Sequence, residues 1–282
     1  MSIKSVLVTG CSAGGIGAAI AIDLANAGHN VFATARNTSK IPEELSSLPN
    51  VTVIQLDVTS KPSVKEAAKT VADRGYGLDV LVNNAGLGYG MPILDMDIEK
   101  AQQLYDVNVW GPVRCIQAFS SLLIRSRGRI VNISTVGAVV NTPWISAYAS
   151  SKAALTNISE SLRLELSPFG VTVVTIMVGT IASNFHDNDI NTKLPEGSRY
   201  VPIEDIIDGW TSGRSTPPSM PADQFAAHIA EDIVGNGKGG LVWKGPNAGT
   251  IKLAIKWFPD SLLDSAMTKD QGIDKLMVAS SN

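Results

Sequence analysis

The chain has 282 residues, of which 44% are hydrophobic and 17% are charged, so it can bury a sizeable core and is unlike a disordered chain. A formal net charge of −3 gives no basic footprint, and we expect no nucleic acid among its partners. Two cysteines, Cys11 and Cys115, are too few for a disulfide framework and are typical of a reduced, cytoplasmic protein. Neither a signal peptide nor an apolar run of the roughly 18 residues of a membrane-spanning helix is found.

The chain opens with the pattern of a strand, a glycine-rich turn and a helix. Ser5 to Thr9 predicts a buried strand, and Ala18 to Ala27 predicts a helix that ends at Gly28. The turn between them reads Gly10-Cys11-Ser12-Ala13-Gly14-Gly15-Ile16-Gly17. Such glycines let a backbone approach a pyrophosphate, and the helix N-terminus offers it free N–H groups. The sequence therefore predicts a dinucleotide site, the alternative being a tight turn that binds nothing.

A second strand is predicted from Asn30 to Ala35, and Arg36 follows it. In a dinucleotide-binding fold, the end of the second strand meets the adenosine ribose. An acidic residue there binds the 2′-hydroxyl, whereas an arginine accommodates a 2′-phosphate. Arg36 therefore favours NADP over NAD. The alternative is a solvated arginine in a loop.

Asp57 and Val58 end a third predicted strand, Val51 to Leu56. The Asp57 carboxylate could accept a hydrogen bond from the adenine amino group. It could equally cap the helical pattern that begins near Pro62.

A short fourth strand, Asp79 to Val82, breaks into Asn83-Asn84-Ala85-Gly86. These small residues suit packing against a ribose, or simply form a turn. A long helix follows from Asp97 to Arg125, interrupted near Asn108, Gly111 and Pro112. Asn108 carries a propensity cost inside a helix. It is either exposed or holds a water in a local kink.

The most informative stretch runs from Ser134 and Thr135 to Tyr148 and Lys152. On the helix predicted from Tyr148 to Leu166, Tyr148 and Lys152 lie one turn apart on one face. An ammonium beside a phenol favours the phenolate and lowers the phenol pKa, which makes a tyrosine usable as a general acid or base. The two upstream hydroxyls could bind the substrate oxygen that Tyr148 protonates.

Strands continue with Arg129 to Ile133 and Val171 to Val178, each separated from the next by helical sequence. This alternation predicts an α/β fold, a Rossmann-like, doubly wound parallel sheet with helices on both faces. We expect a single domain with three parts: a cofactor-binding and catalytic core at 1–185, a substrate lid at 186–222, and a C-terminal helix, last strand and tail at 223–282.

The lid is predicted because 183–222 lacks regular periodicity, is rich in proline and follows the carboxyl end of a strand, where ligands bind in such sheets. A short helix is expected at Ile203 to Trp210. The apolar residues expected to line the substrate pocket are Ile203, Ile206, Ile207 and Trp210. We expect the lid to be mobile without substrate and to order over it.

Residues 251–258 place Lys252 and Lys256 four apart on an otherwise apolar segment. This segment could contact a membrane surface peripherally, or pack on the core or a partner subunit. The three histidines, His29, His186 and His228, are widely spaced, so no metal site is predicted.

Together these motifs resemble the short-chain dehydrogenase/reductase family, strongly over residues 3–185 and loosely beyond. They are, in order, Thr9-Gly10, Gly15-Ile16-Gly17, Asp57-Val58, Asn83-Asn84-Ala85-Gly86, Asn108, Ser134-Thr135, Tyr148, Lys152 and Val178-Gly179. The resemblance implies that Tyr148 exchanges a proton with the substrate oxygen and Lys152 binds the nicotinamide ribose. It also implies that a hydroxyl positions the oxygen, and that Asn108 holds a water in a proton relay. The cofactor residues implied by the motifs and the resemblance are Gly10, Ser12, Gly15, Ile16, Gly17, Arg36, Asp57, Val58, Asn84, Ala85, Gly86, Tyr148, Lys152, Gly179, Ile181 and Ser183.

The chain departs from the usual family pattern at four places. The glycine turn has one extra residue before Gly15-Ile16-Gly17, and Val178 stands where proline is usual. Ser183 replaces a threonine that often touches the carboxamide. Thr135, rather than Ser134, occupies the register of the catalytic serine, and neighbours on a strand face opposite ways. We favour Thr135 as the catalytic hydroxyl.

The sequence thus predicts an NADP(H)-dependent oxidoreductase, a ketoreductase acting on a hydrophobic or lipid-like ketone or alcohol. It is similar to fungal NADPH-dependent 1-acyldihydroxyacetone-phosphate reductases and to fungal biosynthetic ketoreductases, so peripheral contact with the endoplasmic reticulum or lipid droplets is a further expectation. The alternatives are a non-redox isomerase, cyclase or cofactor-binding accessory protein, and a membrane-surface interaction protein. The resemblance also implies a homodimer or homotetramer.

Overall fold

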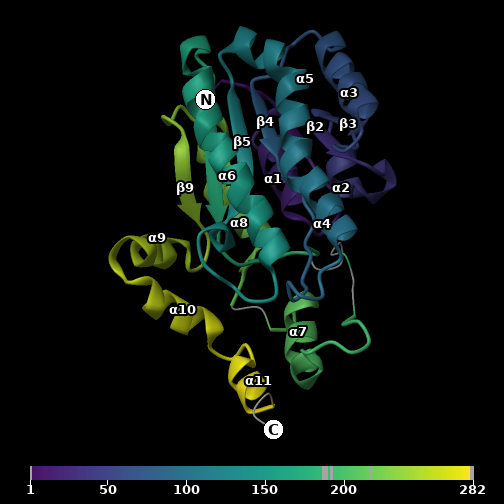
Figure 1. Cartoon of the computed structure of the whole chain (residues 1–282). Helices are drawn as coiled ribbons and strands as arrows, with labels where there is room; N and C mark the ends of the chain where they lie inside the picture. Colours follow the sequence, from purple (N-terminus) through teal and green to yellow (C-terminus); the bar gives the residue numbers. More distant parts are fainter. Residues whose placement is uncertain (1, 186–189, 191–192, 216–217, 280–282) are drawn as a thin grey trace.

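A seven-stranded parallel sheet forms the centre of the molecule (Figure 1). The structure, a computed structural model, describes residues 2–185, 190, 193–215 and 218–279. The strand order is β3-β2-β1-β4-β5-β6-β9. The strands are β1 (Ser5–Thr9), β2 (Asn30–Ala35), β3 (Val51–Gln55), β4 (Val80–Asn83), β5 (Arg129–Thr135), β6 (Thr172–Val178) and β9 (Gly240–Lys244). The predicted single-domain, Rossmann-like fold is confirmed.

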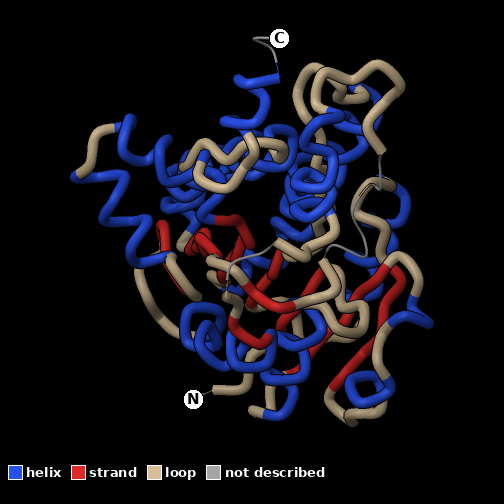
Figure 2. The backbone as a smooth tube through the Cα atoms, turned by 90° about the horizontal axis from the view of Figure 1, so that it is seen from below, coloured by secondary structure: helices blue, strands red, loops and turns tan. Residues whose placement is uncertain are grey.

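Helices cover both faces of this sheet (Figure 2). On one face lie α1 (Ile16–Asn26) and α8 (Ala222–Val234), with the short α2 (Glu43–Ser46) near the β3 edge. On the other lie α3 (Lys61–Asp73), α5 (Gly111–Ser126) and α6 (Ser146–Leu166). Successive strand residues point to opposite faces, so in β1 Val6 and Val8 join the first core and Leu7 joins the second. The strands read as continuous apolar runs because both of their faces are buried.

The sheet order reverses beside β1. The chain runs outward from β1 through β2 to β3, returns to place β4 on the other side of β1, and then proceeds to β9. The loops after β1 and β4 therefore diverge and leave a crevice outside the carboxyl ends of the strands. Figure 1 shows α7, α9, α10 and α11 gathered beyond this end of the sheet.

The long helix expected at 97–125 is interrupted as predicted. It consists of α4 (Ile98–Tyr105), a π-helical turn at Asp106–Trp110, and α5. Within the turn, the Gly111 N–H donates to the Asp106 carbonyl, five residues back. Pro112 falls in the first turn of α5, where its missing N–H costs nothing.

The segment after β6 begins and ends at a two-stranded parallel sheet that is separate from the main one. β7 (Ile181–Ala182) pairs with β8 (Met220–Pro221) and closes the base of the predicted lid. The expected short helix is present as α7 (Glu204–Thr211). Part of the 186–222 lid lies outside the described residues. Its predicted mobility remains a prediction.

Three residues expected to line the substrate pocket do not. Ile203 and Ile207 are buried in a separate cluster with Trp144, and Ile206 packs against that cluster. The cluster is completed by Ile273 and Leu276 of α11 (Ile273–Ala279). The amphipathic pattern predicts α7, but the apolar face of this helix packs against α11, which the sequence did not predict. Only Trp210 of the four residues lines the cavity described below.

The tail forms α9 (Ala248–Trp257), α10 (Asp260–Thr268) and α11. None of the helices in the described ranges is long and apolar enough to cross a membrane.

Candidate active site

One cavity of about 1060 Å³ lies at the carboxyl ends of the strands and collects most of the predicted site residues. The predicted residues that line it are Gly10, Ser12, Gly15, Ile16, Arg36, Asp57, Val58, Asn84, Ala85, Gly86, Ser134, Thr135, Tyr148, Lys152, Gly179, Ile181 and Ser183. Among the lining residues given by the structure, Gly17 and Asn108 do not occur. Residues as far apart in sequence as Gly10 and Ser183 therefore line one cavity.

The glycine turn leaves the N-terminus of α1 open towards this cavity. Gly15 occupies the N-cap position without a side-chain cap, and the first turn carries no acidic residue. Gly10 has φ +76°, and a Cβ there would lie 2.9 Å from the Ala85 Cα. The extra residue of the turn is accommodated by Gly14 at φ +72°, over which the Asn184 side chain packs. Bare backbone N–H groups at a helix start form an anion site.

Gly17 acts differently from the prediction. A Cβ at Gly17 would lie 2.3 Å from Asn84 Nδ2 and 2.5 Å from the Gly10 carbonyl oxygen. Glycine is required here so that α1 can approach the β4 loop closely. Gly17 thus packs against Asn84 and Gly10 and is not among the residues that line the cavity.

Thr9 and Asn84 join the ends of β1 and β4. The Thr9 hydroxyl accepts from the N–H groups of Asn84 (2.9 Å) and Ala85 (3.0 Å), while Asn84 Nδ2 donates to the Thr9 carbonyl (2.8 Å). The Asn84-Ala85-Gly86 segment is thus held in place by hydrogen bonds as well as by its small size, which makes it a fixed wall of the crevice.

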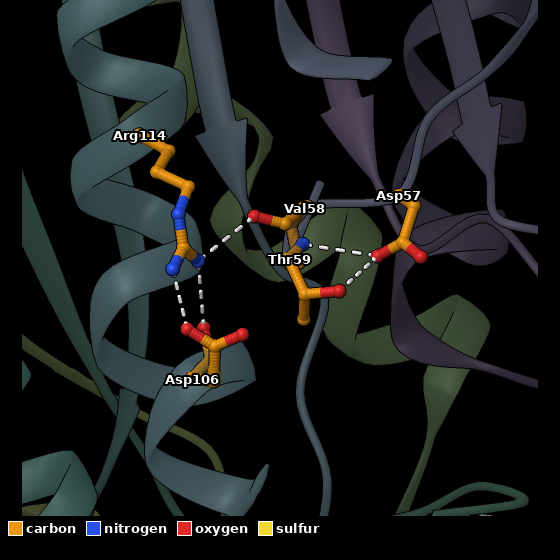
Figure 3. Close-up of polar contacts among 5 residues, drawn as sticks. All are labelled: Asp57, Val58, Thr59, Asp106 and Arg114. Carbon is orange, nitrogen blue, oxygen red and sulfur yellow. Dashed lines mark hydrogen bonds and ion pairs between the residues drawn. The ribbon is translucent and has the colours of Figure 1, made fainter. Parts of the chain in front are cut away.

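Arg36 and Asp57 bound the end of the cavity at which the sequence predicts the adenosine to bind. Arg36 is exposed and lines the cavity at the end of β2. Asp57 Oδ1 accepts from the Thr59 N–H (2.9 Å) and hydroxyl (2.7 Å), as Figure 3 shows. Asp57 therefore does not cap α3. Ser60 does, by accepting from the Ser63 N–H.

Lys152, on α6, is almost completely buried, although it lines the cavity. Its Nζ donates to the Ile133 carbonyl at 2.9 Å, and burial lowers the pKa of Lys152 to about 8. Tyr148, one turn earlier on α6, lines the cavity, and its ring lies 5.3 Å from that of Phe185. The α6 helix thus presents both side chains to the same end of the cavity, as the four-residue spacing predicted.

The two neighbouring hydroxyls are in different surroundings. Ser134 is 2% exposed, and its Oγ lies 2.7 Å from Thr156 Oγ1 and donates to the Lys152 carbonyl at 3.3 Å. Thr135 Oγ1 accepts from the Gly137 N–H (3.2 Å) and donates to the Val178 carbonyl at 3.3 Å. The Thr135 donor is held by one long hydrogen bond, which a substrate oxygen can replace.

Asn108 is buried, which excludes the exposed alternative. Its Oδ1 accepts from the Leu87 N–H (2.8 Å), and its Nδ2 donates to the Leu87 carbonyl (2.9 Å) and to Ser151 Oγ (3.0 Å). Ser151 Oγ donates in turn to the Tyr148 carbonyl at 2.7 Å. The side chain therefore ties the π-helical turn to the loop after β4 and to α6. The expected water relay is untested.

Apart from Trp210, the residues of the outer wall of the cavity were not predicted from the sequence. This wall comes from α7, α9 and α10 and from the turn after α10, through Trp210, Thr250, Ile251, Ala266, Met267, Lys269 and Gln271. No local motif marks these residues. They meet because the last helices fold back beyond the carboxyl ends of the strands.

A dinucleotide fits the residues present on three grounds. The uncapped start of α1 suits a pyrophosphate, and Arg36 suits a 2′-phosphate. The third is the bare backbone at Gly10, which lies so close to Ala85 that a side chain at position 10 would fill the space between the two loops. Among the described residues, no group of three or more histidine, cysteine, aspartate or glutamate side chains could hold a metal ion.

The fold and this site define a dinucleotide-binding protein of the oxidoreductase class. A model of the short chain dehydrogenase family matches residues 4–193. The chain belongs to this family, and the resemblance inferred from its motifs is confirmed.

Known proteins of this family resemble the chain over nearly its full length. The short-chain dehydrogenase ptmH of Penicillium ochrochloron is 42% identical over 274 residues, covering 97% of this chain and 100% of that protein. The NADPH-dependent 1-acyldihydroxyacetone phosphate reductase of Schizosaccharomyces pombe is 36% identical, covering 83% and 80% respectively. A crystal structure of a short-chain dehydrogenase from Streptomyces avermitilis superposes with a TM-score of 0.78 at 28% identity, covering 99% of this chain and 98% of that one.

Proposed function

We propose that this short-chain dehydrogenase is an NADP(H)-dependent ketoreductase whose substrate is a hydrophobic ketone. The observation that carries the proposal is the single cavity, which joins an anion-binding helix start and Arg36 at one end to Tyr148, Thr135 and Lys152 at the other. NADPH, when bound there, supplies a hydride for the carbonyl carbon.

The chain's own residues would supply the proton and orient the substrate. Tyr148 donates a proton to the carbonyl oxygen, and the product is an alcohol. Thr135 donates a hydrogen bond to the same oxygen as negative charge develops on it. The Lys152 ammonium, held by the Ile133 carbonyl, favours the Tyr148 phenolate left after proton transfer. Ser134, engaged with α6, supports the position of that helix.

The substrate would lie against the outer wall. Trp210, Ile251, Ala266 and Met267 contribute apolar surface there, which suits an extended hydrophobic group. The reductase from Schizosaccharomyces pombe, which is named for an acylated ketone, supports this substrate class.

Consumption of NADPH with a panel of hydrophobic ketones tests the activity, and Tyr148→Phe is the decisive variant. We expect its kcat to fall by roughly 10²–10⁴, since it removes the proton donor and keeps the ring. Transfer of label from 4-deuterated NADPH to product separates reduction from a non-redox isomerase or cyclase. A wild-type protein that binds NADPH but transfers no label to any ketone would refute the proposal.

The preference for NADPH is tested at Arg36. Arg36→Asp removes a guanidinium that can pair with the 2′-phosphate and puts a carboxylate in its place. We expect kcat/KM to shift from NADPH towards NADH. A variant that still favours NADPH would remove Arg36 from the site.

We also propose that two copies of the chain associate through α5 and α6. These helices carry exposed apolar side chains, among them Ile124 of α5 at 36% and Leu164 of α6 at 64% exposed. Sedimentation of the wild type and of Leu164→Ser tests this, with dissociation expected in the variant.

A peripheral membrane contact through α9 is a further proposal. Leu253 and Trp257 lie one turn apart and are 59% and 71% exposed, beside exposed Lys252 and Lys256. Tryptophan with flanking lysines suits a lipid headgroup region. Flotation with anionic vesicles should recover the wild type, but not Trp257→Ser. Leu94→Ser, at a position that is also 71% exposed but lies before α4, serves as the control.

A further inference from the structure

The residue of interest is Arg114, on the first turn of α5, which neither the motifs nor the proposed mechanism uses. Its Nη1 donates to the Val58 carbonyl and to the Asp106 carbonyl, both at 3.3 Å. Its Nη2 donates to Asp106 Oδ1 at 2.5 Å. Figure 3 shows the guanidinium between the Asp57-Val58-Thr59 loop and Asp106. One side chain thus bridges two separate segments.

The first segment is a wall of the adenosine end of the cavity. Val58 lines the cavity and is 7% exposed. Gly111 also packs closely against the Val58 side chain, since a Cβ added at Gly111 would lie 2.8 Å from Val58 Cγ2. Thr59 and Ser63 fix the neighbouring Asp57. The Arg114 hydrogen bond therefore acts on a loop whose other contacts leave it little freedom.

The second segment is the π-helical turn. Asp106 begins it, and its carbonyl accepts both from the Gly111 N–H and from Arg114. Asn108, two residues on, holds the backbone of Leu87 and the Ser151 hydroxyl. Leu87 lines the cavity, and Ser151 donates to the Tyr148 carbonyl. The geometry of the turn thus sets where Asn108 meets the loop after β4 and the helix that carries Tyr148.

We propose that Arg114 is a positioning residue that fixes the adenine wall at Val58 and the Asn108 turn together. Arginine suits this role, because its planar guanidinium donates in several fixed directions at once. A lysine ammonium reaches one of these acceptors at a time. The inference rests on the proposed cofactor site, and it adds a residue that touches neither cofactor nor substrate.

Three variants test the bridge, with dissociation of NADPH and hydrogen exchange as readouts that do not depend on turnover. Arg114→Met removes all three hydrogen bonds and keeps most of the packing. We expect the Kd for NADPH and for adenosine 2′,5′-bisphosphate, which carries only the adenosine end, to rise about tenfold. We also expect faster exchange of the Leu87 amide, which donates to Asn108.

Arg114→Lys should give a smaller rise in both Kd values. Asp106→Asn keeps the Val58 hydrogen bond but weakens the pairing within the turn. It should accelerate Leu87 exchange with little change in the Kd for the bisphosphate. The matched control is Arg125→Met, an exposed arginine on the same helix, which should change neither readout.

In turnover, the kcat of Arg114→Met at saturating NADPH should fall about tenfold, since displacement of Asn108 misaligns the Tyr148 helix. A variant that melts earlier but keeps both Kd values and the Leu87 exchange rate would reduce Arg114 to a structural role. A raised Kd with unchanged Leu87 exchange would overturn the link to Asn108. If the wild type reduces no ketone, the proposed function fails, and the binding and exchange measurements still decide the role of Arg114.

Discussion

The two ends of the cavity are built by different means. The end proposed to bind the cofactor is held by hydrogen bonds between main chain and short polar side chains, such as Thr9 with Asn84, and by glycines that admit no side chain. The outer wall is made of longer side chains, such as Trp210, Ile251 and Met267, from helices that are exposed on their other side. The first end tolerates almost no change in shape, whereas the second can change volume without disturbing the sheet.

Among the changes that test this contrast, the largest effect should come from Thr135, the proposed catalytic hydroxyl. Thr135→Val keeps the shape of the side chain and removes its donor, so kcat should fall by roughly 10²–10³. Ser134→Ala should cost far less, because the Ser134 hydroxyl faces Thr156 and the Lys152 carbonyl. Steady-state kinetics at saturating NADPH gives the comparison. Collapse in Ser134→Ala with near-normal turnover in Thr135→Val would reverse the assignment.

A single methyl group tests the rigidity of the cofactor end. A Cβ at Gly179 would lie 1.9 Å from the Pro246 carbonyl oxygen, so Gly179→Ala must displace backbone. We expect the free energy of unfolding to fall by about 1–3 kcal/mol. The control, Gly249→Ala, lies on the exposed side of α9 with no atom within 4 Å of the added Cβ. It should be neutral or stabilising by up to about 1 kcal/mol. Urea denaturation measures both, and equal effects would contradict the contrast.

The outer wall should respond in substrate selectivity. Trp210→Ala removes a large apolar contact, and kcat/KM for a bulky hydrophobic ketone should fall roughly tenfold or more. The Kd for NADPH should stay unchanged, because Trp210 belongs to α7 and the outer wall, whereas the glycine turn precedes α1. Trp257→Ala, at an exposed position on α9, is the control for turnover with a water-soluble ketone. A parallel loss of NADPH binding in Trp210→Ala would mean that the two ends are not independent.

The last effect concerns pH and the buried Lys152. Its pKa is lowered by burial from 10.5 to about 8, so the charged form carries a penalty in the folded protein. Between these pH values the unfolded chain binds more protons than the folded one, and stability therefore rises with pH across the window. Relative to Lys152→Met, the wild-type Tm should increase from pH 8 to 10.5, whereas kcat should decline above pH 8 as the ammonium is lost. A Tm difference that is flat over this range would contradict the burial effect.

Sequence reasoning worked best where a residue type is dictated by its neighbours along the chain. The glycine turn, the Tyr148–Lys152 spacing and the interruption near Asn108 each depend on one local segment, and each was placed correctly. It failed where the outcome depends on a distant partner. The periodicity of this segment gave α7, but Ile207 of that helix and Ile203 just before it pack with α11 instead of lining the cavity.

The sequence by itself determined the parallel sheet, the glycine turn before α1 and the placing of Tyr148 and Lys152 one turn apart on one helix, because strand hydrophobicity, positive-φ glycines and helical spacing are local properties. The tertiary structure decided the rest. It gave Gly17 a packing role against Asn84, turned the Ser134 hydroxyl towards α6, and placed Arg114 between Val58 and Asp106. It also folded α9 and α10 over the crevice. These outcomes depend on which surfaces meet in three dimensions, and that follows from the packing of the whole chain.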